Sequence, residues 1–449
     1  MPVVFDLSRL ISRARFDTPT GIDRFELNYA KWAIDRFDTD LHFVAGGAFG
    51  HRSIHPQVAR SLVTGTDDKW RSHRHCNNQT SLLSNLVDRI ETGRSVMTGN
   101  GGTEQTSASN TAMRALNAAA GLLWTPFDVP ASSLFVHVSH AQIHRQSSYS
   151  WLARRASLPL FYLHDLIPLL RPEFCRAGEA GRHRTRVQTM LRLHRLILCN
   201  SQTTARTLDE LAGAEDLPQP LTAVLPPGLE STFLQFDPGS SVRTVRPYFV
   251  SVGTIEPRKN HALLLDLWRQ LVERHGADAP RLVIAGRRGW DNAHVFSLLN
   301  DLSAFRGAVI EVAGLSDRAL AQLMGGASAL LAPSHIEGYG MPVAEALALG
   351  TPVIASNIRA HREVSRGRAL LIDALDGVGW LSALEAHTRS PRRIEHCEHK
   401  QWTWRAHFEA LHRLLISAKL APEMAATRRL IAYERSSAAH SGSEPCQSL

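Results

Sequence analysis

The second half of the sequence alternates short apolar runs with longer runs of helical periodicity, and this order constrains the fold more than any other feature. Apolar, β-rich runs predict strands, and amphipathic runs predict helices. From residue 248 the expected strands are Tyr248–Thr254, Arg281–Ala285, Val309–Ala313, Ala329–Ala332 and Val353–Ser356, and the expected helices are Ala262–Arg274, Ser316–Met324 and a short one ending at Gly350. Because the connections are short, this order predicts a parallel sheet covered by helices on both faces.

The first half repeats this alternation less regularly. Its expected strands are Val3–Leu7, Leu41–Ala45, Leu134–Val138, Leu160–Leu163, Leu196–Cys199 and Ala223–Leu225, and its helices begin near Gly21 or cover Glu179–Arg195 and Thr203–Leu211. Between the halves, Pro238–Arg246 lacks apolar periodicity, as domain junctions do. We therefore predict two doubly wound, Rossmann-like α/β domains, one over residues 1–240 and one over residues 247–400.

Four segments fall outside this pattern. Residues 64–80 are polar and rich in histidine, and residues 92–111 contain a run of glycine. We expect mobile insertions there, because so little apolar surface does not offset the entropy lost on ordering. Residues 401–418 have apolar side chains at helical spacing, which predicts a helix. The polar residues 435–449 predict a disordered tail.

The charge of the 449 residues favours anionic partners. Fifty lysines and arginines exceed 42 aspartates and glutamates, which gives +8 with the histidines neutral, and such a chain is attracted to phosphates of nucleotides, nucleic acids or lipids. The five cysteines are widely spaced without a CxxC pair, so we expect reduced thiols and no metal site. We expect no secretory leader and no membrane-spanning segment, and therefore a cytoplasmic protein.

The most informative segment is residues 333–352, PSHIEGYGMPVAEALALGTP. A loop that follows a predicted strand carries Glu337. Pro342 then occupies the first turn of a helix, where proline is favoured, and Glu345 lies one turn further on. The segment therefore places one acid in a loop and a second acid inside the helix that follows.

The start of this helix is a predicted phosphate site, because its first amides are unpaired and the helix dipole is positive there. Amides near Gly340, Met341 and Val343 would cradle the phosphate, and Gly338 and Gly340 would let the backbone approach it. The two glutamates fit as acceptors of hydrogen bonds from hydroxyls on either side of the phosphate, as in a nucleotide sugar. The alternative is a solvated loop acid and an ordinary acid favoured by the helix dipole.

Taken together, these residues resemble the family 4 glycosyltransferases, retaining enzymes with the two-domain GT-B fold. Members have two glutamates eight positions apart in a Glu-Gly-Phe/Tyr-Gly-x-Pro context, which Glu337 and Glu345 match. The resemblance implies two domains facing across a cleft, with the donor on the second and the acceptor on the first. It also implies that Glu337 contacts the donor sugar, that Glu345 contacts the ribose, and that the helix at 401–418 returns to the first domain.

A second motif, VGTIEPRKNH at residues 252–261, follows the first strand of the second domain. Ligands of open α/β sheets lie at the carboxyl ends of strands, so Arg258 and Lys259 are placed to meet a diphosphate. The alternative is a basic helix start that faces solvent. The motif is similar to the family's Gly-x-x-x-Pro-x-Lys element, which implies that Gly253 and Lys259 bind the donor. Many relatives have an arginine directly after the glycine; this chain has Thr254, and Arg258 is the candidate to replace that arginine.

Two weaker motifs lie in the first domain. FYLHDLIP at residues 161–168 places His164 and Asp165 at a strand end, where such a pair can hold a sugar hydroxyl or a phosphate oxygen. The alternatives are a structural histidine and a loop cap. The family has a comparable pair facing the donor, which implies that role for His164. TPTGIDR at residues 18–24 looks like the family's glycine loop at the cleft, with Gly21 as the glycine, although a simple helix start explains it nearly as well.

The predicted activity is retaining transfer of a hexose from a nucleoside-diphosphate sugar to a lipid-linked or saccharide acceptor in surface-polysaccharide assembly. The predicted catalytic residues are His164, Arg258, Lys259 and Glu337. The sequence around Lys259 resembles that of family members that use GDP-mannose. The donor is a co-substrate, and no cofactor, metal or nucleic acid is expected.

Three alternatives remain open at this stage. A retaining sugar phosphorylase and a nucleotide-sugar 2-epimerase share the architecture. A nucleic-acid-binding protein would explain the positive charge, although the sequence contains no recognisable basic motif for nucleic acid. The basic surface of Glu179–Arg195 is either simply solvated or attracted to anionic lipid, which would place the enzyme on the inner face of the membrane.

Overall fold

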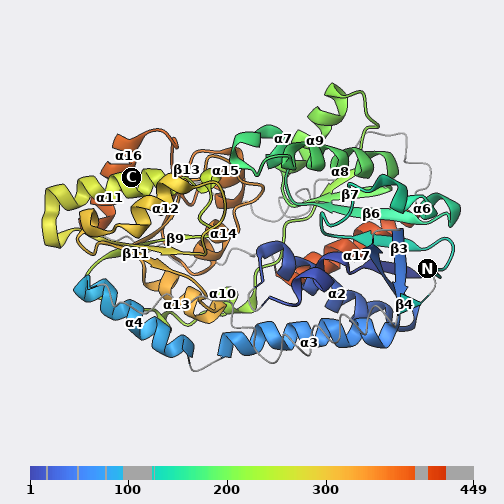
Figure 1. The fold of residues 1–449 in the computed structure, drawn as a ribbon, viewed down its shortest axis with the longest axis horizontal. Helices are drawn as coiled ribbons and strands as arrows, with labels where there is room; N and C mark the ends of the chain where they lie inside the picture. The colour runs from blue at the N-terminus through green and yellow to red at the C-terminus, as the bar shows by residue number, and fades with distance from the viewer. Residues whose placement is uncertain are drawn as a thin grey trace, which may run out of the picture.

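The computed structural model describes residues 1–16, 19–47, 50–75, 78–94, 124–125, 127–389 and 403–420. It contains two α/β domains side by side, each built on a sheet with helices on both faces (Figure 1). The predicted fold class is therefore confirmed. Most of the predicted insertion at 92–111 and the whole predicted tail at 435–449 lie outside the described residues.

The first domain is built on an eight-stranded sheet. In spatial order its strands are β4 (Trp124–Thr125), β3 (Gly50–Ile54), β2 (Leu41–Gly47), β1 (Val3–Asp6), β5 (Leu134–His137), β6 (Leu158–Leu163), β7 (Leu196–Cys199) and β8 (Thr222–Val224). The strands from β2 through β1 and β5 to β8 are parallel, whereas β3 is antiparallel to β2 and β4. The central strands are buried on both faces, which is why they are continuous apolar runs.

Helices cover both faces of this sheet. They are α1 (Ser8–Arg13), α2 (Gly21–Phe37), α3 (Pro56–His75), α6 (Trp151–Arg154), α7 (Ile167–Leu170), α8 (Glu179–Leu193) and α9 (Gln202–Ala214). One face packs against α2, α3 and α17 (Trp404–Leu420), and the other packs against α8 and α9. The last helix of the described chain, α17, thus lies on the first domain, as Figure 1 shows.

The second domain has six parallel strands. Their spatial order is β11 (Val309–Val312), β10 (Arg281–Ala285), β9 (Tyr248–Val252), β12 (Ala329–Ala332), β13 (Val353–Ser356) and β14 (Leu370–Ile372). The helices are α10 (Ser231–Leu234), α11 (His261–His275), α12 (Ala293–Asn300), α13 (Asp317–Gly326), α14 (Met341–Ala348), α15 (Arg359–Ser365) and α16 (Gly377–Arg389). The strand order reverses between β9 and β12, and open α/β sheets bind ligands at such a switch point.

The predicted mobile insertion at residues 64–80 is wrong where the structure describes it. Residues 64–75 continue α3, and residues 78–80 begin α4 (Asn78–Thr92). The polar composition of α3 conceals a buried stripe that includes Val63 and Trp70, and the Trp70 indole Nε1–H donates to the carbonyl oxygen of Phe16 at 2.9 Å. This one apolar face provides the burial that the composition did not predict.

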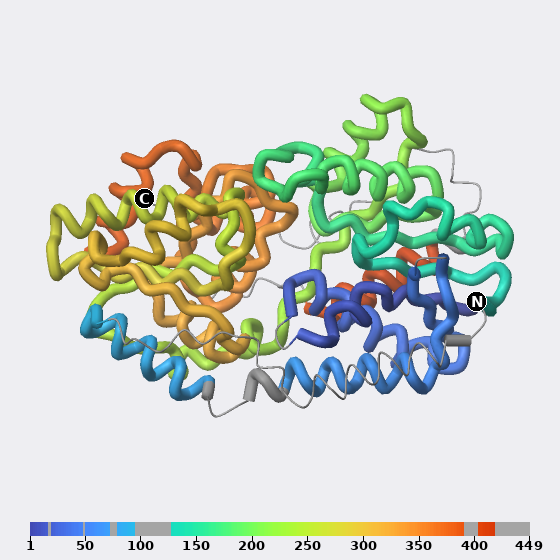
Figure 2. The backbone as a smooth tube through the Cα atoms, viewed as in Figure 1, coloured from blue at the N-terminus to red at the C-terminus, as the bar shows by residue number. Residues whose placement is uncertain are grey.

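The predicted first domain at residues 1–240 also needs a correction, because α4 packs on the second domain. Leu86 and Ile90 are buried in the core of the second domain, and the Arg281 Nε–H donates to the carbonyl oxygen of Ile90 at 3.0 Å. Figure 2 shows α3 and α4 running along the same edge of the molecule, one beneath each domain. Domain membership was predicted from chain order, whereas burial of the apolar face of α4 decides where the helix lies.

Candidate active site

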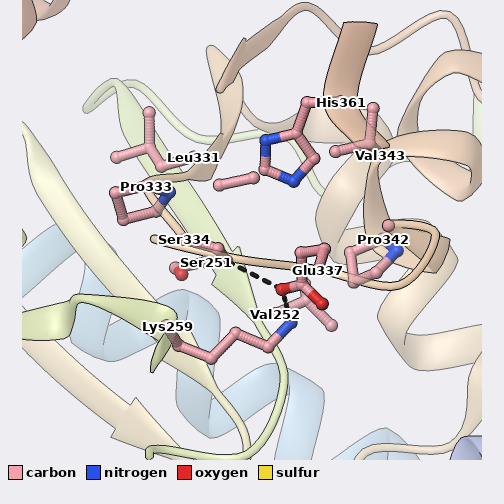
Figure 3. A pocket seen from close by; sticks show the side chains of 12 residues that line it. Ser251, Val252, Lys259, Leu331, Pro333, Ser334, Glu337, Pro342, Val343 and His361 are labelled. Carbon is pink, nitrogen blue, oxygen red and sulfur yellow. Dashed lines mark hydrogen bonds and ion pairs between the residues drawn. The ribbon is translucent and has the colours of Figure 1, made fainter. Parts of the chain in front are cut away.

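Two loops meet where the strand order of the second sheet reverses. Since β9 and β12 are parallel neighbours, residues 253–260 and 333–340 leave the sheet side by side. With α14 and α15 they surround a pocket whose polar lining includes Lys259, Glu337 and His361 (Figure 3). The predicted motifs of the second domain therefore converge in space.

Position 253 requires a glycine because the side chain of Lys259 passes close to it. Gly253 has a φ of +135°, and a Cβ built there would lie 3.3 Å from Cε of Lys259. A side chain would be strained and would crowd the lysine stem. The glycine thus leaves room for the side chain of Lys259 to cross the end of β9 and enter the pocket.

Glu337 is held by three donors. Lys259 Nζ lies 2.6 Å from Oε1, the Ser334 hydroxyl donates to Oε1 at 2.8 Å, and Arg258 Nη1 lies 2.5 Å from Oε2. The side chain is only 8% exposed. Burial alone would raise the pKa of Glu337, but Arg258 and Lys259 outweigh burial and hold it well below its usual range. Glu337 is therefore an ionised acceptor with both oxygens engaged.

Arg258 also contacts Glu256, which the sequence analysis did not single out. Arg258 Nε lies 2.5 Å from Oε1 of Glu256, whose side chain is 2% exposed. Burial would lower the pKa of Arg258, but Glu337 and Glu256 raise it above its usual value. The guanidinium thus stays charged and is fixed between two buried carboxylates, which excludes the alternative of a solvent-facing basic helix start.

The start of α14 follows Gly340, which has a φ of +101°, and Pro342 lies in the first turn as predicted. One detail differs from the expectation. The amide of Val343 already donates to the carbonyl oxygen of Gly340 at 3.0 Å, so this N–H is not free for a phosphate. The side chain of Val343 still lines the pocket. Of the three predicted amides, that of Met341 belongs to the first residue of α14.

Glu345 lies inside α14, half-buried and close to charged groups of other elements. Burial raises its pKa to about 8, and the nearby carboxylates of Asp317 and Glu230 raise it too, whereas Arg24 lowers it. Arg24 itself reaches from α2 to α13, with Nη2 2.8 Å from Oδ1 of Asp317. Glu345 thus belongs to a second charged group at the interface of the domains, and Lys259, a partner of Glu337, also lowers its pKa.

His164 lies at the end of β6 in the first domain. Its Nε2–H donates to the carbonyl oxygen of Val138 at 2.8 Å, because a carbonyl oxygen only accepts. Burial lowers the pKa of His164 to about 4, so the ring is neutral at physiological pH. The bond to Val138 leaves Nδ1 as an acceptor, and it also gives the ring the structural role that was the alternative for a lone histidine.

The first domain touches the loop of residues 333–340 at Gly338. The Ser201 hydroxyl donates to the carbonyl oxygen of Gly338 at 2.7 Å, and a Cβ at Gly338 would collide with the carbonyl oxygen of His164 and with Cβ of Asp165. The glycine therefore permits this close approach of the two domains. Asp165 itself accepts from the amide of Ile167 at 3.1 Å, as the loop-cap alternative proposed.

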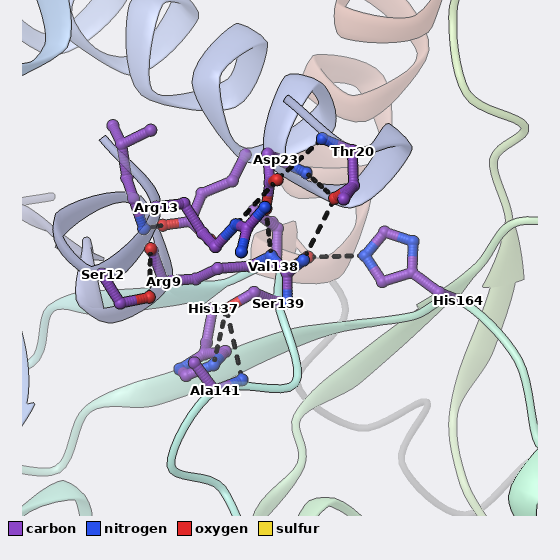
Figure 4. Close-up of polar contacts among 12 residues, drawn as sticks. Arg9, Ser12, Arg13, Thr20, Asp23, His137, Val138, Ser139, Ala141 and His164 are labelled. Atoms are coloured by element: carbon purple, nitrogen blue, oxygen red, sulfur yellow. Dashed lines mark hydrogen bonds and ion pairs between the residues drawn. The ribbon is translucent and has the colours of Figure 1, made fainter. Parts of the chain in front are cut away.

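Gly21 begins α2, and its predicted glycine loop behaves locally as a helix start. Thr20 is the N-cap, and Asp23 completes a capping box with it. Figure 4 shows Arg9 and Arg13 reaching Asp23 from α1, with Nε atoms 2.7 and 3.0 Å from the carboxylate oxygens. A Cβ at Gly21 would meet nothing within 4 Å, so the glycine borders open space.

Comparison with known proteins identifies the second domain. Residues 236–374 match the family described as "Glycosyl transferases group 1". The second domain therefore resembles group 1 glycosyltransferase domains. The match includes both predicted donor motifs, around Lys259 and around Glu337.

Proteins similar to this chain include bacterial mannosyltransferases. It is 28% identical over 275 residues to the serotype-specific mannosyltransferase WbdA of Escherichia coli, covering 56% of this chain and 32% of WbdA. It is 31% identical over 140 residues to the O-antigen chain mannosyltransferase B of Escherichia coli, covering 31% of this chain and 35% of that protein. The chain thus spans about a third of the length of these relatives.

The architecture around the group 1 domain matches solved structures over nearly the whole chain. Anabaena Alr3699/HepE in complex with UDP-glucose aligns with a TM-score of 0.56 at 15% identity, covering 93% of this chain and 100% of that chain. Sucrose-phosphate synthase from Thermosynechococcus elongatus aligns with a TM-score of 0.54 at 15% identity and the same coverage. These neighbours have the GT-B fold, which confirms the predicted arrangement of two Rossmann-like domains.

Proposed function

We propose that this chain is a retaining glycosyltransferase that moves a hexose, with mannose from GDP-mannose as the first candidate, to a lipid-linked or saccharide acceptor. The observation that carries the proposal is the meeting of Lys259, Arg258 and Glu337 with the start of α14 at the switch point of the second sheet. The names of the Escherichia coli relatives favour mannose. The complexes of HepE with UDP and UDP-glucose make UDP sugars the second donor class to test.

The proposed role of the two cations is to stabilise the leaving diphosphate. When the bond between the anomeric carbon and the phosphate oxygen breaks, negative charge grows on that oxygen. Lys259 has three N–H donors and Arg258 has five, so both retain donors beyond those that Glu337 and Glu256 receive. Because the carboxylates hold the cations in place beforehand, little reorganisation is needed in the transition state.

Glu337 is proposed to orient the donor sugar without forming a bond to it. Both carboxylate oxygens already accept from Lys259, Ser334 or Arg258, and the ion pairs keep the group ionised. A carboxylate held in this way is a poor nucleophile but still has lone pairs for a sugar hydroxyl. This favours front-face attack by the acceptor, with the departing phosphate oxygen taking the acceptor proton. No cofactor is part of the proposal.

The acceptor is proposed to bind the first domain. The basic surface of α8 is partly neutralised, because Arg182 and Arg186 pair with Glu179, and Arg184 pairs with Glu215. None of the described helices is long and apolar enough to cross a membrane. We propose a cytoplasmic enzyme that meets its acceptor at the inner face of the membrane.

Donor binding can be tested by thermal unfolding with GDP-mannose, UDP-glucose and UDP-N-acetylglucosamine. A ligand present at 100 times its Kd stabilises the folded state by about 2.7 kcal/mol, so the true donor should raise Tm clearly. We expect GDP-mannose to do so. Stabilisation by UDP sugars alone would reject mannose as the transferred sugar.

Transfer itself is tested with Lys259→Ala, for which we expect at least a 100-fold loss of kcat because a donor to the leaving group is removed. Arg269→Ala on the exposed face of α11 is the matched control, since among the described residues Arg269 pairs only with Asp266 at the surface. Full activity of Lys259→Ala would overturn the assignment. Product that forms only with inorganic phosphate would indicate a phosphorylase, and epimerised free sugar without acceptor would indicate the epimerase.

A further inference from the structure

His361 has a ring nitrogen that the proposed mechanism does not use. The residue lies in α15, is 1% exposed and lines the same pocket as Glu337 and Lys259. Its Nδ1 lies 3.0 Å from the carbonyl oxygen of Ser356. Since a carbonyl oxygen only accepts, Nδ1 must carry a proton, and in the neutral ring Nε2 is left with a lone pair.

The neighbouring hydroxyl supports this tautomer. Ser356 Oγ lies 3.2 Å from Nδ1 of His361, but its own proton is directed to the carbonyl oxygen of Ser334. The hydroxyl therefore has no proton to give to the ring, and Nδ1–H faces two acceptors. The ring is thus fixed by the end of β13, and its orientation does not depend on any group in the pocket.

Nε2 faces the pocket without a partner in the described part of the chain. In Figure 3 the Nε2 edge of the ring points toward the space above Glu337. A Cβ added to Gly340, the N-cap of α14, would lie 3.2 Å from Cδ2 and 3.7 Å from Nε2, so this edge borders the start of the helix. A ligand group that donates a hydrogen bond in the pocket would satisfy this lone pair.

The lone pair on Nε2 of His361 determines which kind of ligand group can bind there. Burial lowers the pKa of His361, Lys259 lowers it too, and Glu337 opposes them, so the ring is predominantly neutral at physiological pH. A neutral Nε2 accepts hydrogen bonds and repels phosphate oxygens, which also only accept. A hydroxyl matches it, because a hydroxyl can donate.

We propose that Nε2 of His361 accepts a hydrogen bond from a hydroxyl of the transferred sugar, and that His361 is a specificity-determining residue for the donor. This inference rests on the proposed function, since the hydroxyl belongs to the same nucleotide sugar. Glu337 and His361 line one pocket. The ribose hydroxyls of the nucleoside diphosphate are expected at Glu345 instead, so the nucleoside diphosphate without the transferred sugar would leave Nε2 without a donor.

Two substitutions separate the nitrogens of the ring. His361→Asn retains an N–H near the position of Nδ1, so it can still donate to Ser356, and it lacks the group at Nε2. His361→Gln places an amide near Nε2 instead. We expect His361→Asn to lower kcat/KM for the donor that stabilises the wild type by 10- to 100-fold, whereas its Kd for the nucleoside diphosphate changes less than twofold. His361→Gln should recover part of the lost kcat/KM.

Monodeoxy analogues of the donor sugar identify the hydroxyl on the wild type itself. One analogue should lose the same 10- to 100-fold with the wild type and no further activity with His361→Asn, because each change removes the same bond. Additive losses for every analogue would overturn the inference, as would an unchanged kcat/KM of His361→Asn or an equal loss in nucleoside-diphosphate affinity. If His361→Asn does not fold, wild-type kinetics that show no large loss for any analogue would overturn it.

Failure of the proposed function would give a different experimental result. In that case the wild type neither binds nor turns over GDP-mannose, UDP-glucose or UDP-N-acetylglucosamine, and the inference falls with it. Activity of the wild type combined with an insensitive His361→Asn would contradict the inference alone.

Discussion

Arg258 lies between two buried carboxylates, Glu256 and Glu337, and with Lys259 the four side chains form one charged cluster. The formal charges of these four groups cancel, so the cluster can be buried without an isolated charge. Glu337 contacts Nη1 of Arg258, whereas Glu256 contacts Nε. Its effect on the reaction would therefore be to position the guanidinium.

We predict that Glu256→Gln lowers kcat at least 10-fold without raising the Kd of the nucleoside diphosphate. The variant leaves the cluster with one extra positive charge, which attracts the diphosphate, but it removes the ion pair that orients Arg258. Steady-state kinetics and calorimetric titration measure the two quantities. Glu256→Asp, which keeps the charge, should retain more activity; an unchanged kcat in Glu256→Gln would show that Arg258 is positioned by other contacts.

The raised pKa of Glu345 predicts that the free energy of unfolding depends on pH. Its pKa is raised to about 8 in the folded protein, against an ordinary value of 4.5, so the folded state binds more protons than the unfolded state between these values. Stability from this group therefore falls as pH rises through that window. Glu345→Gln should be more stable than the wild type at pH 9 by on the order of 1 kcal/mol, and the advantage should shrink toward pH 5.

Urea unfolding of both proteins across this range measures the difference. Because Glu26 also has a pKa raised by burial to about 8, the wild-type curve alone is not diagnostic, and the difference between wild type and variant isolates Glu345. An advantage that is independent of pH would contradict the raised pKa.

At the scale of elements, a helix of the first domain is capped by a side chain of the second. The carboxylate of Glu363, in α15, accepts from the amide of Gln202 at 2.6 Å and from the amide and hydroxyl of Thr203 at 3.0 and 2.9 Å. These are amides of the first turn of α9, where a negative charge is favoured by the helix dipole. With the bond from Ser201 to Gly338, this cap holds α15 and the loop of residues 333–340 against the first domain.

We predict that Glu363→Ala opens the two domains relative to each other. Removal of a capping carboxylate costs about 0.5–2 kcal/mol, which is enough to shift a balance between closed and open arrangements. Small-angle X-ray scattering should show a larger radius of gyration for the variant. The control is Glu210→Ala, which removes the exposed contact between Glu210 and Arg359 at 4.0 Å and should leave the radius unchanged. Equal radii for the wild type and both variants would contradict a closing role.

At the scale of the whole molecule, the chain crosses between domains more than twice. α4 lies on the second domain although its neighbours along the chain belong to the first, and α17 lies on the first domain after the second is complete. His407 of α17 joins this helix to two distant segments, with Nε2 2.8 Å from the hydroxyl of Tyr29 and Nδ1 2.7 Å from the carbonyl oxygen of Pro226. Neither domain is therefore one continuous segment.

We predict that Ile90→Ala destabilises the second domain by about 2–4 kcal/mol, because Ile90 is fully buried in its core. Hydrogen exchange should show loss of protection in β11 and α13, which α4 contacts. Val87→Ala, on the partly buried side of the same helix, is the matched control and should cost less. Loss of protection confined to the first domain would contradict the placement of α4.

Much of this protein could be predicted from local patterns. Alternating strands and helices determine a parallel sheet because each pattern follows from its own short segment. Pro342 and Gly340 predict the start of α14 in the same way, and Gly253 and Lys259 share a single loop. The residues that bind Glu337 thus lie in two short motifs, and the position of these motifs after β9 and β12 predicts that they meet.

What the sequence alone did not determine is which hydrogen bonds the folded chain forms. The amide of Val343 bonds within its own turn, the Nδ1–H of His361 bonds to Ser356 while Nε2 has no partner among the described residues, and Glu363 caps a helix of the other domain. The sequence pattern indicates none of these bonds, because each depends on how the segments are placed in the folded protein. The polar composition around Trp70 likewise conceals a buried face. Periodicity determined the sheets, whereas only the tertiary structure decided which domain each helix covers and which polar atoms remain for a ligand.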